Sequence, residues 1–164
     1  MSSPLAPPHV LFVCLGNICR SPLMEGIVRE HWRGRPESVW LDSAGLGDWH
    51  AGQPPDPRAI AVAGRYGIDI AGQRARALAA EDFHHFGLIL CADRENLADL
   101  RRRQPHAAQG EIALFLDWTG VQAGGEVPDP YLGHERDFET VFRLIERGAQ
   151  GLAERMQAFA SPAR

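Results

Sequence analysis

The chain of 164 residues contains no lysine, so all seventeen of its basic residues are arginines. Acidic residues outnumber them, and the formal net charge is −4 at pH 7. A nucleic-acid-binding domain usually carries a basic patch or stripe, which favours contact with phosphates. The mildly acidic balance therefore gives no indication of a nucleic-acid partner.

Cysteine is also scarce, because the sequence contains only three. An odd and small number of cysteines cannot form a disulfide framework. Cys14 and Cys19 lack histidine or cysteine partners at the spacing of a zinc site, so we expect neither a metal nor a cofactor. Unpaired thiols are typical of a reducing compartment, which predicts a cytoplasmic location.

Long apolar runs are absent. No stretch approaches the ~18 apolar residues that predict a transmembrane helix. Residues 2–8 contain neither a basic segment nor an apolar segment, so they do not resemble a signal peptide. We expect a flexible N-terminal tail at 1–8, a single domain at 9–160 and a C-terminal tail at 161–164.

The sequence does contain an alternation of apolar runs and helical patterns. Strands are expected at 10–13, 39–41, 86–91 and 112–116, and helices at 22–33, 57–66, 94–103 and 138–159. The stretch 71–83 has mixed helical character. This alternation predicts an α/β fold whose parallel sheet carries helices on both faces. In such sheets ligands bind beyond the carboxyl ends of the strands.

Residues 14–21 follow the first predicted strand and combine a thiol with an anion-binding pattern. A loop that enters a helix points several backbone N–H groups at one spot, where the helix dipole adds positive charge. Gly16 and Asn17 tolerate left-handed backbone angles, and Arg20 can bind two oxygens with its planar fork. Ser21 is expected to be the helix N-cap. The pattern predicts a phosphate-binding loop.

Cys14 lies at the end of the strand, below the predicted anion. An ordinary cysteine is mostly a protonated thiol at neutral pH. Loop N–H groups, Arg20 and the Ser21 hydroxyl would together stabilise the thiolate. Such a thiolate is suited to nucleophilic attack on phosphorus.

The motif Cys14-Leu15-Gly16-Asn17-Ile18-Cys19-Arg20-Ser21-Pro22 resembles the signature loop of the low-molecular-weight protein tyrosine phosphatases. The similarity continues through Asp42-Ser43-Ala44-Gly45, Trp49-His50-Ala51-Gly52, Asp56-Pro57-Arg58, Leu90-Cys91-Ala92-Asp93 and Asp129-Pro130-Tyr131. Within this family, the sequence resembles the bacterial-type members.

The resemblance implies a three-layer α/β sandwich around a four-stranded parallel sheet in the flavodoxin-like order 2-1-3-4. It implies that Leu15, Gly16, Asn17, Ile18, Cys19 and Ser21 bind phosphate. It also implies that Ser43 supports Asn17, where many members add a histidine at the position of Gln73. Because glutamine can donate and accept hydrogen bonds, we expect Gln73 to replace that support.

Two aromatic residues are expected to flank the substrate. Trp49 lies in a loop, where a large aromatic side chain usually packs or binds. The resemblance makes Trp49 one wall of the substrate cleft, with Tyr131 opposite and Leu132 as an outer wall. We leave His50 as a surface residue. A slot of this kind suits the flat ring of an aryl phosphate.

Asp129 is the expected general acid. Pro128 and Pro130 lack the backbone N–H groups that would favour its ionised form. The predicted reaction is the hydrolysis of phosphotyrosine through a cysteinyl-phosphate on Cys14, with Arg20 stabilising charge and Asp129 acting as acid and then as base. Cys19, on the same loop, is either a redox partner of Cys14 or a structural residue, and the sequence leaves both roles open.

Three alternatives remain open. Arsenate reductases share the scaffold but relay electrons through further cysteines, and here only Cys91 is available. Protein-arginine phosphatases typically have threonine at the position of Ile18. A non-catalytic phosphate-binding module would need neither Cys14 nor Asp129. The expected partner is a phosphotyrosine-containing protein, such as a bacterial tyrosine kinase, with no nucleic acid and no membrane.

Overall fold

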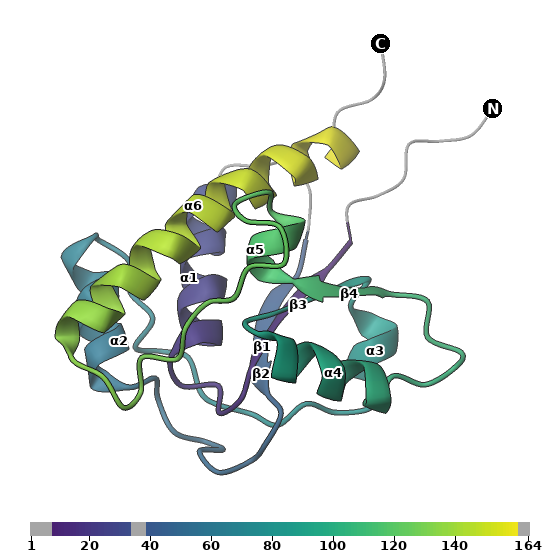
Figure 1. The fold of residues 1–164 in the computed structure, drawn as a ribbon, viewed down its shortest axis with the longest axis horizontal. Helices are drawn as coiled ribbons and strands as arrows, with labels where there is room; N and C mark the ends of the chain where they lie inside the picture. Colours follow the sequence, from purple (N-terminus) through teal and green to yellow (C-terminus); the bar gives the residue numbers. More distant parts are fainter. Residues whose placement is uncertain (1–7, 34–38, 161–164) are drawn as a thin grey trace.

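The computed structural model describes residues 8–33 and 39–160, which form one parallel four-stranded sheet covered by helices (Figure 1). The strands are β1 (Val10–Cys14), β2 (Leu41–Gly45), β3 (Leu88–Cys91) and β4 (Glu111–Leu114). Their order is β2-β1-β3-β4, as the family resemblance predicted. Strand β1 is central, with Val13 paired to Ala44 on one side and to Cys91 on the other.

Helices cover both faces of this sheet (Figure 1). One face carries α1 (Arg20–Trp32), α2 (Pro57–Arg65), α5 (Phe115–Trp118) and α6 (Glu135–Ala160). The other face carries α3 (Asp82–His85) and α4 (Arg94–Arg103). The predicted three-layer α/β sandwich is therefore confirmed.

The two cores follow from the alternation of side chains along β1. Val10 and Phe12 pack on the face of α1 and α6, whereas Leu11 and Val13 pack on the face of α3 and α4. All four are fully buried. Because each large apolar side chain contributes ~1.5–3 kcal/mol when buried, a strand apolar on both faces is stable only at the centre of such a sheet.

Helix α6 supplies the longest apolar stripe. Its buried side chains are Phe138, Val141, Phe142, Ile145, Ala149, Leu152, Ala153 and Met156. They recur at a spacing of three to four residues, which places them on one side of the helix. This stripe packs chiefly against α1 and is core, as the sequence pattern predicted.

Two helix starts were also predicted correctly. Asp56 caps α2, because its carboxylate accepts the N–H of Arg58 at 2.8 Å and Pro57 takes the first helical position. Asp93 caps α4 in a capping box, and its carboxylate accepts the N–H of Asn96 at 2.9 Å.

Three element predictions were wrong. The strand expected at 39–41 lies instead at Leu41–Gly45, and Trp40 is 62% exposed. Pairing with β1 outweighs the weak strand propensity of this glycine- and serine-containing segment. The strand expected at 112–116 ends at Leu114, where α5 begins. Residues 71–83, where mixed helical character was expected, are mostly irregular. Ala77 forms an isolated bridge to Gly45, and α3 begins only at Asp82.

The expected tails lie largely outside the described residues, since 1–7 and 161–164 are not among them. In the part of the chain that the structure describes, no helix has the length and apolar character needed to cross a membrane.

Candidate active site

The phosphate-binding loop predicted at 14–21 connects β1 to α1 at the carboxyl end of the central strand. Asn17 adopts a left-handed backbone conformation, with φ of 59°. Asparagine tolerates this conformation better than most residues because its short side chain can bond locally. The turn at Asn17 lets the chain fold back over Cys14 before α1 begins.

The side chain of Asn17 is almost fully buried and uses both ends of its amide. Its nitrogen donates to the hydroxyl oxygen of Ser21 at 2.7 Å and to that of Ser43 at 3.0 Å. Its oxygen accepts the backbone N–H of Arg76 at 3.0 Å. A strained backbone turn is thus stabilised by hydrogen bonds from three separate segments.

Ser43 connects this turn to a buried carboxylate. Its hydroxyl donates to Glu25 at 2.8 Å, while Arg29 donates to the other carboxylate oxygen at 2.9 Å. Burial raises the pKa of Glu25, although the bonds from Arg29 and Ser43 oppose the shift. The predicted support of Asn17 by Ser43 is therefore present, and Glu25 orients the serine hydroxyl.

Gln73 does not replace the expected histidine. Its side-chain nitrogen donates to the carbonyl of Pro22 at 3.1 Å, in the first turn of α1. The amide oxygen of Asn17 instead accepts the Arg76 N–H. Gln73 supports the helix start, and the expectation that it bonds Asn17 was wrong.

The thiol of Cys14 lies beneath the loop and is buried. Its sulfur is 3.0 Å from the hydroxyl oxygen of Ser21 and 3.4 Å from the Ser21 backbone nitrogen. Ser21 is consequently not the N-cap that we expected. The helix begins at Arg20 after Cys19, and the serine hydroxyl faces the thiol from inside the first turn.

Arg20 is buried and held by carboxylates from two other loops. One terminal nitrogen donates to Asp93 at 2.7 Å and to the carbonyl of Val127 at 3.0 Å. The other lies 3.5 Å from the carboxylate of Asp129. Burial alone would lower the pKa of Arg20, but Cys14, Asp93 and Asp129 together raise it. The guanidinium therefore stays charged and fixed in direction.

Asp129 lies on the loop between α5 and α6, and its carboxylate is about half exposed, at 46%. The flanking prolines themselves offer no backbone N–H to this carboxylate. One donor is nevertheless present, because the N–H of Tyr131 lies 3.1 Å from a carboxylate oxygen. The donor comes from the residue after Pro130, where a turn brings the chain back towards the carboxylate.

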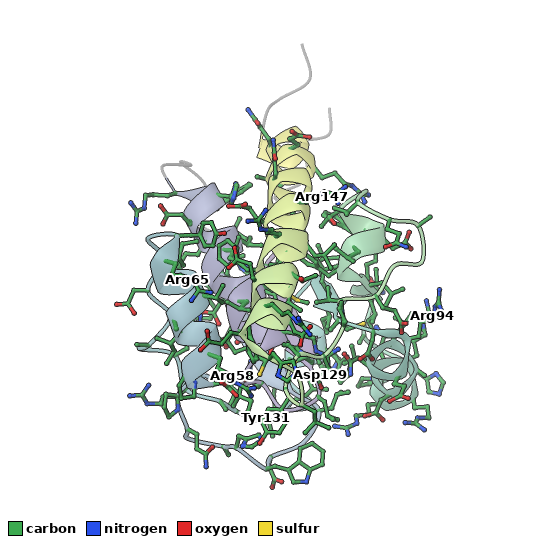
Figure 2. All side chains as sticks on the ribbon, turned by 60° about the vertical axis from the view of Figure 1, so that its left-hand side comes forward. Arg58, Arg65, Arg94, Asp129, Tyr131 and Arg147 are labelled. Atoms are coloured by element: carbon green, nitrogen blue, oxygen red, sulfur yellow. The ribbon has the colours of Figure 1, made fainter. Side chains whose placement is uncertain are left out.

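These groups surround a pocket of about 220 Å³. Its lining residues are Cys14, Leu15, Gly16, Ile18, Cys19, Arg20, Trp49, His50, Asp129 and Tyr131. Figure 2 shows Asp129 and Tyr131 near each other at one end of the molecule, close to the start of α6. Asn17 and Ser21 are buried below the loop rather than lining the pocket.

Two pocket predictions need correction. Leu132 is 93% exposed and does not line the pocket, because the turn after Pro130 directs it away. His50 does line it, with its ring centroid 6.3 Å from that of Tyr131. Its position next to Trp49 in the same loop was the available signal. Trp49 lines the pocket as predicted.

The remaining cysteines differ in their surroundings. Cys19 lines the pocket, and burial raises the pKa of its thiol, with Asp56 and Cys14 adding to the shift. Cys91 is fully buried at the end of β3, and burial raises its pKa to about 12. In residues 8–33 and 39–160, none of the three cysteines forms a disulfide, and no group of metal-ligating side chains is present.

Comparison with known proteins identifies the family. The sequence model of the low molecular weight phosphotyrosine protein phosphatases matches residues 9–161. The pig low molecular weight phosphotyrosine protein phosphatase is 39% identical over 152 residues, covering 90% of this chain and 95% of that protein. The low molecular weight protein-tyrosine-phosphatase YfkJ of Bacillus subtilis is 38% identical over 150 residues, covering 90% and 95%.

Solved structures agree. The crystal structure of YfkJ from Bacillus subtilis superposes with a TM-score of 0.84 at 36% identity, covering 95% of this chain and 98% of that one. A protein tyrosine phosphatase from Entamoeba histolytica, with Hepes in its active site, gives a TM-score of 0.85 at 32% identity, covering 93% and 99%. The chain belongs to the low molecular weight phosphotyrosine protein phosphatase family.

Proposed function

We propose that Cys14, Arg20 and Asp129 carry out the reaction of this protein, the hydrolysis of phosphotyrosine through a cysteinyl-phosphate intermediate. Membership in a phosphotyrosine phosphatase family supports the reaction. One observation supports the residue roles above all others. The thiol, the guanidinium and the carboxylate line one pocket, although Asp129 lies more than a hundred residues beyond Cys14.

The phosphoryl group would bind in the loop between β1 and α1. Backbone N–H groups of this loop and the start of α1 offer positive partial charge to a dianion. Arg20 adds a full charge and is already oriented by Asp93. Because these donors are fixed before substrate arrives, they stabilise the charge on the phosphoryl oxygens without reorganising. This family acts without a metal ion.

In the first step, the Cys14 thiolate attacks phosphorus and the bond from phosphorus to the phenolic oxygen breaks. Asp129 in its acid form donates its proton to the departing phenolate oxygen. The products of this step are the free phenol and a cysteinyl-phosphate. Ser21 assists, because its hydroxyl lies 3.0 Å from the sulfur and can donate to the thiolate.

In the second step, water attacks the cysteinyl-phosphate. The Asp129 carboxylate takes a proton from that water, the sulfur–phosphorus bond breaks, and the thiolate returns as inorganic phosphate leaves. The residue that was the acid in the first step is the base in the second. Loop N–H groups and Arg20 stabilise the transferring phosphoryl group in both steps.

Aryl phosphates are the proposed substrate class. A phenol, with a pKa near ~10, leaves more readily than an alkoxide. Trp49 and Tyr131 line the pocket and give a flat ring apolar surface to pack on. We therefore expect turnover of phosphotyrosine to exceed that of phosphoserine by a wide margin; equal rates would contradict an aromatic slot.

The alternative readings have less support. An arsenate reductase relay would need an accessible further cysteine, whereas Cys91 is fully buried and its thiol faces the carbonyl of Ala113 at 3.5 Å. Protein-arginine phosphatases typically have threonine where this chain has Ile18. A simple binding module would gain nothing from a thiol and a carboxylate facing one pocket.

The role of Cys14 is tested by the variant Cys14→Ser. A serine hydroxyl is far less nucleophilic than a thiolate, so we expect turnover of an aryl phosphate to be abolished while inorganic phosphate still binds. Cys91→Ser is the matched control and should retain most activity. Near-normal activity of Cys14→Ser would overturn the proposal.

The role of Asp129 is tested by pH–rate profiles on phenyl phosphate for the wild-type protein and for Asp129→Ala. We expect the variant to lose about 10²- to 10⁴-fold in kcat, together with the limb of the profile that reports the acid. The control is Asp69→Ala, which removes an exposed aspartate bonded to the N–H of Ala71 outside the pocket. An unchanged profile in Asp129→Ala would refute the assignment.

We also propose a partner and a location for this protein. A phosphotyrosine phosphatase acts on phosphotyrosine-containing substrates, and a tyrosine kinase must supply them. A bacterial tyrosine kinase is the proposed partner. Cytoplasmic residence is supported by the thiol chemistry, since Cys14 must remain reduced to act as nucleophile.

A further inference from the structure

Arg58, in the first turn of α2, binds the loop that carries Asp129. Its terminal nitrogens donate to two carbonyls of that loop, to Tyr131 at 2.9 Å and to Gly133 at 3.2 Å. These partners lie more than seventy residues away in the sequence. Figure 2 shows Arg58 beside Asp129 and Tyr131 at the same end of the molecule.

The base of Arg58 is held firmly. Its Nε and one terminal nitrogen donate to the two carboxylate oxygens of Asp56, at 3.0 and 2.9 Å. Burial opposes the charge on Asp56, but the bonds from Arg58 outweigh it and lower the pKa of that carboxyl. The guanidinium plane is therefore fixed by a bidentate ion pair before it reaches the loop.

Asp56 in turn belongs to the phosphate-binding end of the molecule. Its backbone N–H donates to the carbonyl of Ile18 at 2.8 Å, and Ile18 lines the pocket. A continuous path of hydrogen bonds therefore runs from the phosphate loop through Asp56 and Arg58 to the loop of Asp129. This path joins the two halves of the site.

Arg58 binds the loop of Asp129 at its far end. At its near end, the N–H of Val127 donates to Ala92 at 2.8 Å and the Val127 carbonyl accepts from Arg20. The following segment contains Pro128 and Pro130, which have no N–H to offer. Arg58 then binds the chain on the other side of Asp129, and its guanidinium carbon lies 4.5 Å from the ring centroid of Phe138 in α6.

We infer that Arg58 is a positioning residue for leaving-group protonation, which it serves by holding the loop of Asp129 at a set distance from the phosphate-binding loop. The inference rests on the proposed function, because it requires Asp129 to be the acid. Arg58 does not line the pocket and so acts through the loop rather than on the substrate.

This role predicts a selective defect. Loss of Arg58 leaves the donors of phosphate binding in place, since those come from the loop after β1 and from Arg20. It frees the loop beyond Asp129, and a misplacement of about 1 Å can cost a large part of the rate. The cost should be greatest for leaving groups that need a proton and smallest for those that do not.

The experiment compares kcat/KM for phenyl phosphate and for 2,4-dinitrophenyl phosphate, whose leaving group needs little protonation. This quantity reports the steps up to loss of the phenol and leaves out the later hydrolysis of the cysteinyl-phosphate, which is common to both substrates. In Arg58→Met we expect kcat/KM for phenyl phosphate to fall about tenfold, and kcat/KM for the dinitro compound to change less than about twofold. The inhibition constant of inorganic phosphate should stay within about twofold of the wild-type value.

A double variant separates positioning from general destabilisation. If Arg58 acts through Asp129, Arg58→Met should cost nothing further on phenyl phosphate in an Asp129→Ala background. Arg65→Met is the matched control, because Arg65 is on the same helix and pairs with Glu139 away from the pocket. Arg65→Met should leave the kinetic constants for both substrates unchanged.

The conservative variant Arg58→Lys provides the second test and decides the matter if Arg58→Met does not fold. Lysine keeps a charge beside Asp56 but lacks the fork that reaches both carbonyls, so the selective loss on phenyl phosphate should persist. Equal losses on both substrates, or additive losses with Asp129→Ala, would overturn the inference. If Asp129→Ala alone showed no dependence on the leaving group, the proposed acid itself would fail, whatever Arg58 does.

Discussion

The side-chain nitrogen of Asn17 lies 2.7 Å from the hydroxyl oxygen of Ser21. Because this nitrogen can only donate, it occupies a lone pair of the serine and leaves the serine proton free for another acceptor. The sulfur of Cys14, 3.0 Å from the same oxygen, is that acceptor. The residue that shapes the turn thus also directs a hydrogen bond at the proposed nucleophile.

Ser21→Ala should therefore slow the first step. Without the hydroxyl, the Cys14 sulfur loses a hydrogen-bond donor, and a bond to a charged group is worth ~1.5–3 kcal/mol. We expect both kcat on phenyl phosphate and the rate of alkylation by iodoacetate at neutral pH to fall about tenfold or more. The control is Thr140→Ala, which removes a hydroxyl on the exposed side of α6. Unchanged alkylation would contradict the role of the hydroxyl.

Trp49→Ala should weaken the binding of the aryl ring. Trp49 is 65% exposed, and covering its ring with the substrate contributes to binding rather than to the chemical step. We expect KM for phosphotyrosine to rise about fivefold to tenfold, with a smaller change in kcat. Leu132→Ala is the matched control, since Leu132 does not line the pocket. A similar rise in KM for both variants would show that Leu132 also contacts the substrate.

Mild peroxide should link Cys14 to Cys19. Peroxide converts the Cys14 thiolate to a sulfenic acid, and the Cys19 thiol then displaces water to form a disulfide. Burial keeps Cys19 protonated, because it raises the pKa of that thiol, so Cys14 is oxidised first. Mass spectrometry of the loop peptide should show the link, and a thiol reductant should restore activity.

The matched variant for this prediction is Cys19→Ser. Without the second thiol, the sulfenic acid of Cys14 should proceed to the irreversible sulfinic form, so reductant should no longer restore activity. Full recovery in Cys19→Ser would show that Cys19 has no protective part.

Asp56→Asn should reduce stability at neutral pH but not in acid. The folded pKa of Asp56 is lowered, so its contribution to the free energy of unfolding is present above the unfolded pKa of ~3.9 and is lost as pH falls through the folded pKa. Asparagine keeps the N-cap, so the change isolates the charge.

Urea unfolding at pH 7 should show a loss of about 1–3 kcal/mol for Asp56→Asn, the range of a hydrogen-bonded charge. Near pH 3 the difference between the wild-type protein and the variant should shrink. The control is Asp69→Asn, an exposed aspartate whose carboxylate accepts the backbone N–H of Ala71. A difference that grows in acid would contradict the assigned sign.

Local patterns predicted much of this molecule. The apolar run of β1, the caps at Asp56 and Asp93, and the stripe of α6 depend on residues close together in the chain, and the structure contains them all. The loop at 14–21 was recognisable because its residue types and spacing are a local requirement for binding an anion. Even the strand order was available once the family was recognised.

Other features could not be predicted from local sequence, because their partners come from distant segments. Serine is a common N-cap residue, but the hydroxyl of Ser21 instead contacts the side chains of Asn17 and Cys14. Gln73 was expected to bond Asn17, but its side-chain nitrogen donates to the carbonyl of Pro22, and the Asn17 oxygen accepts from Arg76. His50 lines the pocket because its loop folds over Gly16. The two residues are so close that a Cβ added at Gly16 would lie 3.1 Å from the histidine ring.

The sequence by itself determined the elements of this protein and the chemistry of its loop at 14–21, since those depend on side-chain type and short-range spacing. Only the tertiary structure decided how Asp129 meets that loop. Its position depends on Arg20 at one end and Arg58 at the other. Both are long-range hydrogen-bonded contacts, and such contacts form only when the sheet has brought the carboxyl ends of its strands together.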